Sequence, residues 1–450
     1  MTVDERIDEW RNHFRRRQAV SAADVDEMED HLRNQIEALQ AAGLDESEAF
    51  LVAVKRLGEQ DAVALEFARE YSERLWKQLV LAPGGEGSSP ARRDGGVALL
   101  CAAAAAVAIK LPELFGHRLH GPLADSSYYL RNFSLFVLPF LAAFFAWKRG
   151  LAASGWLRQA APFLLGALGV NLLPFVPRGQ TEQLSAIHLP IALWMMIAFA
   201  YTGGAWRRHE GRMNYVRFSG EWFIYLALIA LGGGVLVGFT AFIFQAIGLD
   251  PKLVISDWLL PCGVMGAVIV AAWLVEAKQS VIENMAPVLT WLFTPLFAAL
   301  LLVFVVTMLV TGSAIQVGRE VLIGFDLLLV LVLGLLLYSI SARDSQAPPR
   351  RFDLLQLLLV VCALLVDVLA LWAISARISE FGASPNKAAA LGLNLLLLVN
   401  LGGSAVHYAR FLGGRTPFPR LERWQTATLP LFAAWAWVVA LLFPMLFGYR

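Results

Sequence analysis

The sequence is poor in charge and in cysteine. Only 16% of its 450 residues are charged, 58% are hydrophobic, and the formal net charge at pH 7 is +1. A chain with no excess of either sign gives no electrostatic indication of a nucleic-acid partner, and we expect none. The three cysteines, Cys101, Cys262 and Cys362, have neither disulfide nor metal-ligand spacing. No metal or other cofactor is therefore expected.

Motifs that would define an enzyme are also lacking. The sequence contains neither the glycine-rich P-loop pattern nor the His-Glu-x-x-His pattern. Its N-terminus, MTVDERIDEW, is acidic and is not followed by the short apolar run of a secretory signal peptide. We therefore expect a protein that is not an enzyme and whose N-terminus stays in the cytoplasm.

Residues 1–80 carry the pattern of a small helical bundle. The segment SAADVDEMEDHLRNQIEALQAAG places its apolar residues on one helical face and ends at a glycine. We predict a cytoplasmic helical domain over residues 1–80 and a flexible linker over residues 81–95, which are rich in Gly, Ser and Pro. The apolar face consists of Val25, Met28, Leu32, Ile36 and Leu39.

The stretch DEMEDHLRNQIEALQAAGLDESEAFLVAVKRLGEQDAVALEFARE resembles the permease prefix domain, a helical module that precedes bacterial multipass membrane proteins. The AAGLDESEA turn and the RLG stop carry the likeness, which covers residues 5–75. The resemblance implies a regulatory or interaction role without catalysis. It also implies a cytoplasmic protein partner that binds through residues 1–80.

Residues 96–450 consist of long apolar runs with short polar breaks. Because a helix needs about 20 apolar residues to cross a bilayer, we predict about eleven transmembrane helices and an all-α protein that contacts the lipid bilayer. The fifth span is long enough to tilt or to break at its glycines 232–234. The predicted spans are 96–114, 131–147, 156–176, 187–205, 221–248, 255–276, 288–311, 320–341, 354–376, 385–408 and 427–447.

The distribution of Lys and Arg predicts the orientation. With residues 1–80 inside the cell, the inner loops carry about twice as many Lys and Arg residues as the outer loops, as the positive-inside rule requires. An odd number of spans then places the C-terminus outside. We expect a multipass protein of the bacterial inner membrane with a cytoplasmic N-terminus and a periplasmic C-terminus. Nothing in the pattern defines an oligomeric state.

Two segments, NFSLFVLPFLAAFFAWKRG and SPNKAAALGLNLLLLVNL, resemble an uncharacterised family of bacterial membrane proteins, domain of unknown function 4153. In that family a tetrad similar to Thr-Pro-Asn-Arg opens a late helix. Here Ser384, Pro385, Asn386 and Lys387 stand at that place. Ser384 can cap a helix, and Pro385 fits its first turn. The family has no established activity, so the resemblance implies only the class of protein.

Polar residues within the apolar spans form the candidate functional site. Asp326, Asp367 and Asn394 lie at similar depths in the outer half of three successive spans, and Lys110 lies near the outer end of the first. Ionisable groups at such depths cost several kcal/mol unless they are paired or hydrated. One interpretation is a polar cavity open to the outside, in which an aspartate binds a proton or cation. The other is structural, with Lys110 paired to an aspartate or with hydrogen bonds between helices.

Two functions remain open at this point. The first, slightly favoured by the well-defined helical domain, is a membrane sensor or scaffold whose residues 1–80 mediate regulation or bind a partner. The alternative is a permease-like transporter with Asp326 and Asp367 in an outer-half polar cavity and with residues 1–80 as its regulator. Transporters often consist of two matched halves with broken helices. We find no such internal repeat in the sequence.

Overall fold

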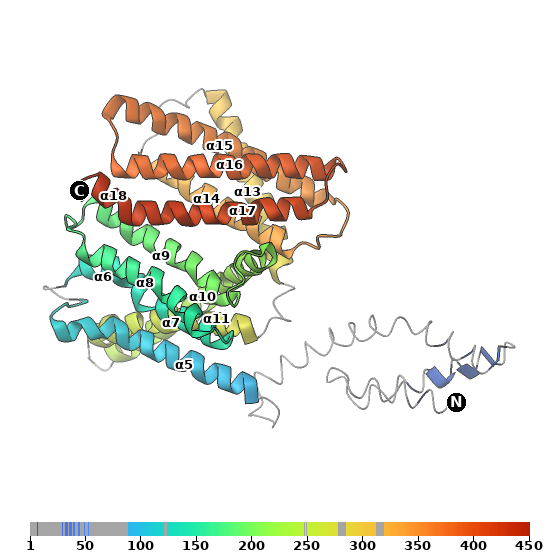
Figure 1. Cartoon of the computed structure of the whole chain (residues 1–450), viewed down its shortest axis with the longest axis horizontal. Helices are drawn as coiled ribbons and strands as arrows, with labels where there is room; N and C mark the ends of the chain where they lie inside the picture. Colours follow the sequence, from blue (N-terminus) through green and yellow to red (C-terminus); the bar gives the residue numbers. More distant parts are fainter. Residues whose placement is uncertain are drawn as a thin grey trace. The chain divides into compact units, whose positions relative to one another are not determined.

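The chain divides into two compact units, Met1–Ser88 and Ser89–Arg450 (Figure 1). The computed structural model describes residues 89–450 except 121–123, 247, 249, 278–284 and 312–318. In the first unit it describes residues 7, 29, 32–34, 36–37, 39–40, 44–45, 49 and 53.

The described residues of the first unit include part of the predicted apolar stripe. Leu32, Ile36 and Leu39 are helical and buried. Arg33 and Glu29, one turn apart, form an ion pair at 3.0 Å. The rest of the predicted bundle lies outside the described residues.

The predicted linker, residues 81–95, is partly helical. The first helix of the second unit begins at Ser89, so the last residues of the predicted linker belong to that helix. Residues 81–88 lie outside the described residues.

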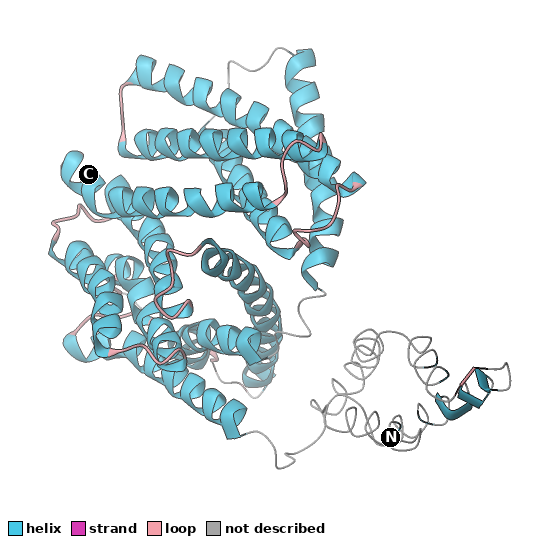
Figure 2. Cartoon of the chain, turned by 45° about the vertical axis from the view of Figure 1, so that its right-hand side comes forward, coloured by secondary structure: helices cyan, strands magenta, loops and turns pink. Residues whose placement is uncertain are grey.

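Every named element of the second unit that the structure describes is helical (Figure 2). These elements are α5 (Ser89–Lys110), η1 (Leu111–Phe115), α6 (Ser126–Asn132), η2 (Phe133–Phe136), α7 (Leu138–Lys148), α8 (Ala153–Leu172), α9 (Gln180–Tyr201), α10 (His209–Ala246), η3 (Leu253–Leu259), α11 (Leu260–Ala277), α13 (Met285–Thr311), α14 (Arg319–Ala342), α15 (Arg351–Phe381), α16 (Pro385–Leu412), α17 (Pro419–Trp437), η5 (Val438–Leu442) and α18 (Phe443–Leu446).

Ten helices among the described residues are long and apolar enough to cross a membrane. The predicted span that is missing from these ten, 156–176, corresponds to α8, which is less apolar because it contains Arg158 and Asn171. α8 nevertheless reaches both ends of the helices that it packs against. Leu151, just before α8, packs near Gly204 beyond the end of α9. Near the other end, Asn171 exchanges hydrogen bonds with Asn132 at the end of α6.

The fifth predicted span belongs to α10, a continuous helix of 38 residues that does not break at glycines 232–234. At 1.5 Å per residue it is about 57 Å long, more than the roughly 30 Å of a hydrocarbon core. Its first part packs into the domain through Met213, Tyr215 and Phe218. No residue is buried in its most apolar window, so the rest of the helix presents an apolar surface.

Two large hydrophobic cores lie in the described part of the second unit, besides a smaller cluster around Val439 and Phe443. The first lies mainly among α5, α7, α9 and α11 and is rich in aromatic residues, including Phe144, Phe145 and Phe218. The second lies mainly among α13, α14, α15 and α16 and is mostly aliphatic, as at Leu336 and Leu397. α9 packs against α17 and so joins the two halves (Figure 1).

Where α16 pairs with α17, tryptophan rings of α17 pack directly against glycines of α16. A Cβ atom at Gly403 would overlap Trp424, and one at Gly392 would overlap Trp435. The two contacts are about three turns apart on both helices. The helices are therefore antiparallel in a single register, and the missing side chains let the indole rings reach the α16 backbone.

We predict that Gly403→Ala lowers the free energy of unfolding by about 1–3 kcal/mol, because the added methyl group overlaps the Trp424 ring. Thermal unfolding of the purified protein measures the change. Gly402→Ala is the matched control, since nothing lies within 4 Å of a Cβ atom there. Equal stability of the two variants would contradict this packing.

Candidate functional site

α16 begins at the predicted motif. The Ser384 hydroxyl accepts a hydrogen bond from the backbone N–H of Lys387 at 3.4 Å, and Pro385 occupies the first turn. The Lys387 ammonium donates to the backbone carbonyls of Arg377 (3.2 Å) and Gly382 (2.8 Å). These carbonyls are at the end of α15, where helical partners are lacking. The motif therefore caps one helix and ends another.

Asn394 lies about two and a half turns into α16 and contacts α14. Its Nδ2 donates to Asp326 Oδ1 on α14 at 2.7 Å and to the backbone carbonyl of Ala390 at 2.9 Å. Asn394 is fully buried, and its Oδ1 has no hydrogen-bond partner among the described residues. Asn386, in the first turn of α16, is half-buried.

Asp367 is fully buried on α15, with 0% of its surface exposed. Neither of its carboxyl oxygens has a hydrogen-bond partner among the described residues. Asp326 is half-buried and lies close enough to Asp367 for the two carboxyl groups to interact electrostatically. Asp326, Asp367 and Asn394, from three neighbouring helices, are termed the acidic cluster.

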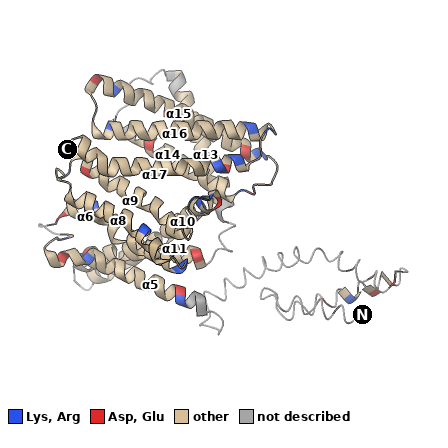
Figure 3. Ribbon diagram, viewed as in Figure 1, with Lys and Arg blue, Asp and Glu red and all other residues tan. Residues whose placement is uncertain are grey.

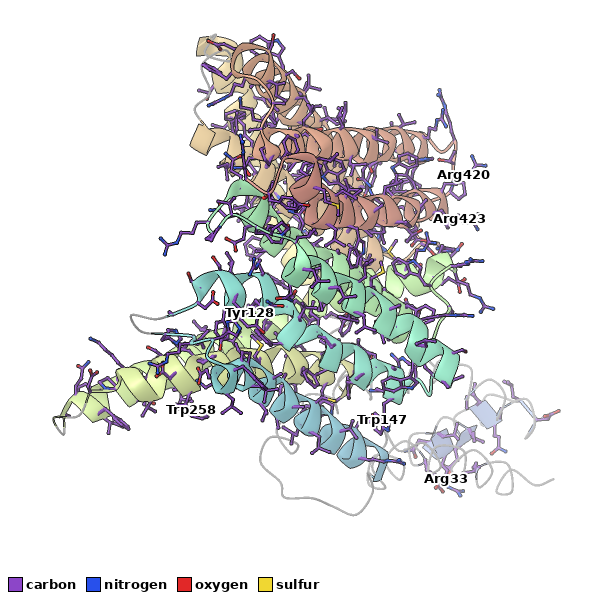
Figure 4. The ribbon with its side chains drawn as sticks, turned by 60° about the vertical axis from the view of Figure 1, so that its left-hand side comes forward. Arg33, Tyr128, Trp147, Trp258, Arg420 and Arg423 are labelled. Atoms are coloured by element: carbon purple, nitrogen blue, oxygen red, sulfur yellow. The ribbon has the colours of Figure 1, made fainter. Side chains whose placement is uncertain are left out.

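Lys110, the fourth predicted site residue, lies apart from the acidic cluster. Its ammonium forms an ion pair with Glu113, one turn further along the chain. It also lies 4.8 Å from the ring centroid of Trp258, which is labelled in Figure 4. α5 is at the opposite edge of the domain from α15 and α16 (Figure 1). The structure therefore gives Lys110 a local partner and does not bring it to Asp326 or Asp367.

A second polar cluster lies between α16 and α17. Asn400 Nδ2 donates to Gln425 Oε1 at 2.9 Å and to Thr428 Oγ1 at 2.7 Å. Gln425 Nε2 donates to Ser404 Oγ at 2.6 Å, and Trp424 Nε1 donates to the backbone carbonyl of Asn400 at 3.0 Å. Each side chain has a partner, so this cluster links two helices and leaves no polar atom available for a ligand.

Gln356 on α15 is a buried polar residue that the sequence analysis did not single out. It is 1% exposed, and its Nε2 donates to Thr294 Oγ1 (3.1 Å) and Ser339 Oγ (2.8 Å). Its Oε1 has no hydrogen-bond partner among the described residues. Gln356 lies about three turns before Asp367 on the same helical face. This spacing is a signal that could have identified Gln356 from the sequence.

An apolar layer separates Gln356 from Asp367. The two residues are about 16 Å apart along the axis of α15. Val360 and Ala363, on the face between them, are fully buried. Polar groups therefore occupy two levels of this helix without a polar connection along it.

No group of three or more His, Cys, Asp or Glu side chains that could hold a metal ion occurs in the part of the chain that the structure describes. Cys101, Cys262 and Cys362 are free thiols. The acidic cluster supplies only oxygen and amide groups, which suit a proton or a hard cation better than a soft metal.

Comparisons with known proteins found no match. No family model matches the chain, and neither a search of curated proteins nor one of solved structures gave a significant similarity. The resemblances to the permease prefix domain and to domain of unknown function 4153 therefore stay predictions.

We predict that Asp367→Leu raises the free energy of unfolding by about 1–3 kcal/mol, because it removes a buried polar group that has no partner. Chemical unfolding in detergent micelles measures the change. A loss of stability would show that the carboxyl group has a partner.

Asp353, also buried on α15, provides the matched comparison. Its carboxylate accepts hydrogen bonds from the Arg343 guanidinium at 2.9 and 3.1 Å and from the backbone N–H of Arg350 at 2.7 Å. Asp353→Leu should therefore destabilise the protein by about 3–5 kcal/mol, since it leaves a charged arginine without its partner.

Proposed function

We propose that the second unit is the membrane domain of a permease-like transporter that binds protons at the acidic cluster. The ten long apolar helices support a multipass membrane protein. The observation that carries the proposal is Asp367, which is fully buried and has no hydrogen-bond donor at either oxygen. A charged carboxylate in such a place is costly, and binding a proton removes that cost.

The three residues of the acidic cluster suit different steps of proton binding. Asp326 is half-buried, so it is the more accessible carboxyl group and receives the proton. Its hydrogen bond from Asn394 fixes its position. Asp367 is the interior group, which is fully buried and lies near Asp326. Proton transfer between the two would neutralise the buried group.

The apolar layer supports a carrier and argues against an open channel. Val360 and Ala363 are fully buried between the levels of Asp367 and Gln356. A proton at Asp367 has no polar group along α15 to move to in this conformation. Passage to the other side therefore requires the helices to rearrange, as in alternating access.

The proposed orientation follows from exposed positive charge. Lys and Arg gather at the ends of α16 and α17 that lie away from the C-terminus (Figure 3). The positive-inside rule assigns these ends to the cytoplasmic side of the bacterial inner membrane. The acidic cluster then lies in the outer half of the bilayer, and the C-terminus lies in the periplasm.

The first unit keeps its predicted regulatory role in this proposal. Most of residues 1–80 lie outside the described residues. Binding of a cytoplasmic partner through this unit, and the sensor function that the sequence slightly favoured, remain predictions. The acidic cluster shifts our preference to transport because adhesion between helices does not account for the unpartnered Asp367.

We predict that proteoliposomes containing the protein take up protons when an inside-negative potential is imposed, and that Asp326→Asn or Asp367→Asn reduces the rate to that of protein-free liposomes. Each change removes a proton-binding carboxyl group while keeping a side chain of similar size. The measurement is the fluorescence of an entrapped pH dye after a potassium diffusion potential is set with valinomycin.

Glu380→Gln is the matched control for this assay. Glu380 is an exposed carboxylate on α15, outside the acidic cluster, so its removal should leave proton uptake unchanged. Wild-type vesicles that behave like protein-free liposomes would overturn the proposed transport, and so would normal uptake by both aspartate variants.

A further inference from the structure

The register of α16 and α17 brings a histidine opposite an arginine at the cytoplasmic ends of these helices. Trp424 lies on Gly403. His407 is one turn further along α16, and Arg420 is one turn earlier on the antiparallel α17, so the two face each other. The His407 and Trp424 rings have centroids 5.8 Å apart, and Trp424 is fixed by its hydrogen bond to the Asn400 carbonyl.

Positive charge is concentrated around His407. Arg410, on the last turn of α16, and Arg420 and Arg423, on the first turns of α17, are exposed. Figure 4 shows Arg420 and Arg423 at the same end of α17. Arg410 and Arg420 lie close enough to His407 to interact with it electrostatically. None of these three arginines forms an ion pair with a carboxylate that the structure describes.

Glu422, the acidic residue of this region, interacts mainly with charges other than Arg410 and Arg420. Glu422 is half-buried and interacts electrostatically with His209, Arg217, Arg343 and Arg423. Arg410 and Arg420 are not among these residues, and neither forms an ion pair with Glu422.

His407 also has an unused polar atom. Its Nδ1 is buried and has no hydrogen-bond partner among the described residues. A ring nitrogen beside two guanidinium groups is well placed to donate to an anionic oxygen. An anion bound here would balance the charges of Arg410 and Arg420, and it would reach the buried Nδ1 once the His407 ring turns toward it.

The surroundings indicate the kind of anion. Val406, next to His407, is 48% exposed and presents an apolar surface at the end of a membrane-crossing helix. A lipid offers both a phosphate for the arginines and an acyl chain for this surface, whereas free phosphate offers only the first. We propose that Arg410, Arg420 and His407 form a binding site for the phosphate group of an anionic phospholipid in the cytoplasmic leaflet.

The test is native mass spectrometry of the full chain, released from nanodiscs of mixed phosphatidylglycerol and phosphatidylcholine. The wild-type protein should retain phosphatidylglycerol preferentially. Arg410→Gln and Arg420→Gln should each weaken retention about fivefold, as expected for one arginine near an anionic surface. The double variant should show no preference between the two lipids. Unfolding in lipid-free detergent establishes that the variants remain folded.

Arg118→Gln is the control, because Arg118 is exposed at the opposite end of the domain. It should retain phosphatidylglycerol as the wild type does. A second arm adds inorganic phosphate during release, which should not displace the lipid. Wild-type retention by the double variant, equal retention of phosphatidylcholine by the wild type, or displacement by phosphate would each overturn the proposal. These outcomes do not depend on proton transport, since the acidic cluster is intact in every variant.

Discussion

A polar side chain inside a layer of apolar helices must find its partner within the protein, because no water is present there to replace it. The second unit meets this requirement almost completely between α16 and α17, where Asn400 and Gln425 bond to each other and to hydroxyl groups. It meets the requirement only in part at Asn394 and not at all at Asp367. The same helical bundle contains both outcomes, and the proposed proton site rests on the unsatisfied carboxyl group.

The position of α16 decides which polar groups meet. Its start is fixed by the Ser384 cap and by the Lys387 ammonium on the end of α15. Its register against α17 is fixed by the two tryptophan–glycine contacts. Asn394 then reaches Asp326 on α14. At the other end the same register places His407 beside Arg420. Two sites with opposite charge therefore depend on a few packing contacts along a single helix.

The sequence was sufficient for the helical class, the start of α16 and the similar depth of Asn394 and Asp326, because helix periodicity and span boundaries place residues at a common depth. Their hydrogen bond is a finding of the structure. It was not sufficient for Lys110, whose partner Glu113 is local and whose helix lies at the far edge of the domain. Hydropathy also excludes α8 from the candidate membrane spans and includes α9, although the two helices pack side by side. Gln356 was missed because its role depends on Thr294 and Ser339, which are contributed by other helices.

The acidic cluster and the proposed lipid site both include residues of α16, and together they constrain the proposed transport cycle. In the proposed transport, a proton that enters from outside is drawn inward by a potential that is negative on the cytoplasmic side, by about 2.3 kcal/mol per 100 mV for the full membrane. At Asp367 such a proton has crossed only part of that field, and the next residues on this face of α15, Val360 and Ala363, are buried and apolar. Protonated Asp367 is neutral, so in the proposed cycle the remaining field acts on α15 only while the carboxyl group is charged. In that proposal the electrical force acts on the return of α15 with its charged carboxylate, while α16 holds Asp326 through Asn394 at one end and the proposed lipid phosphate at the other.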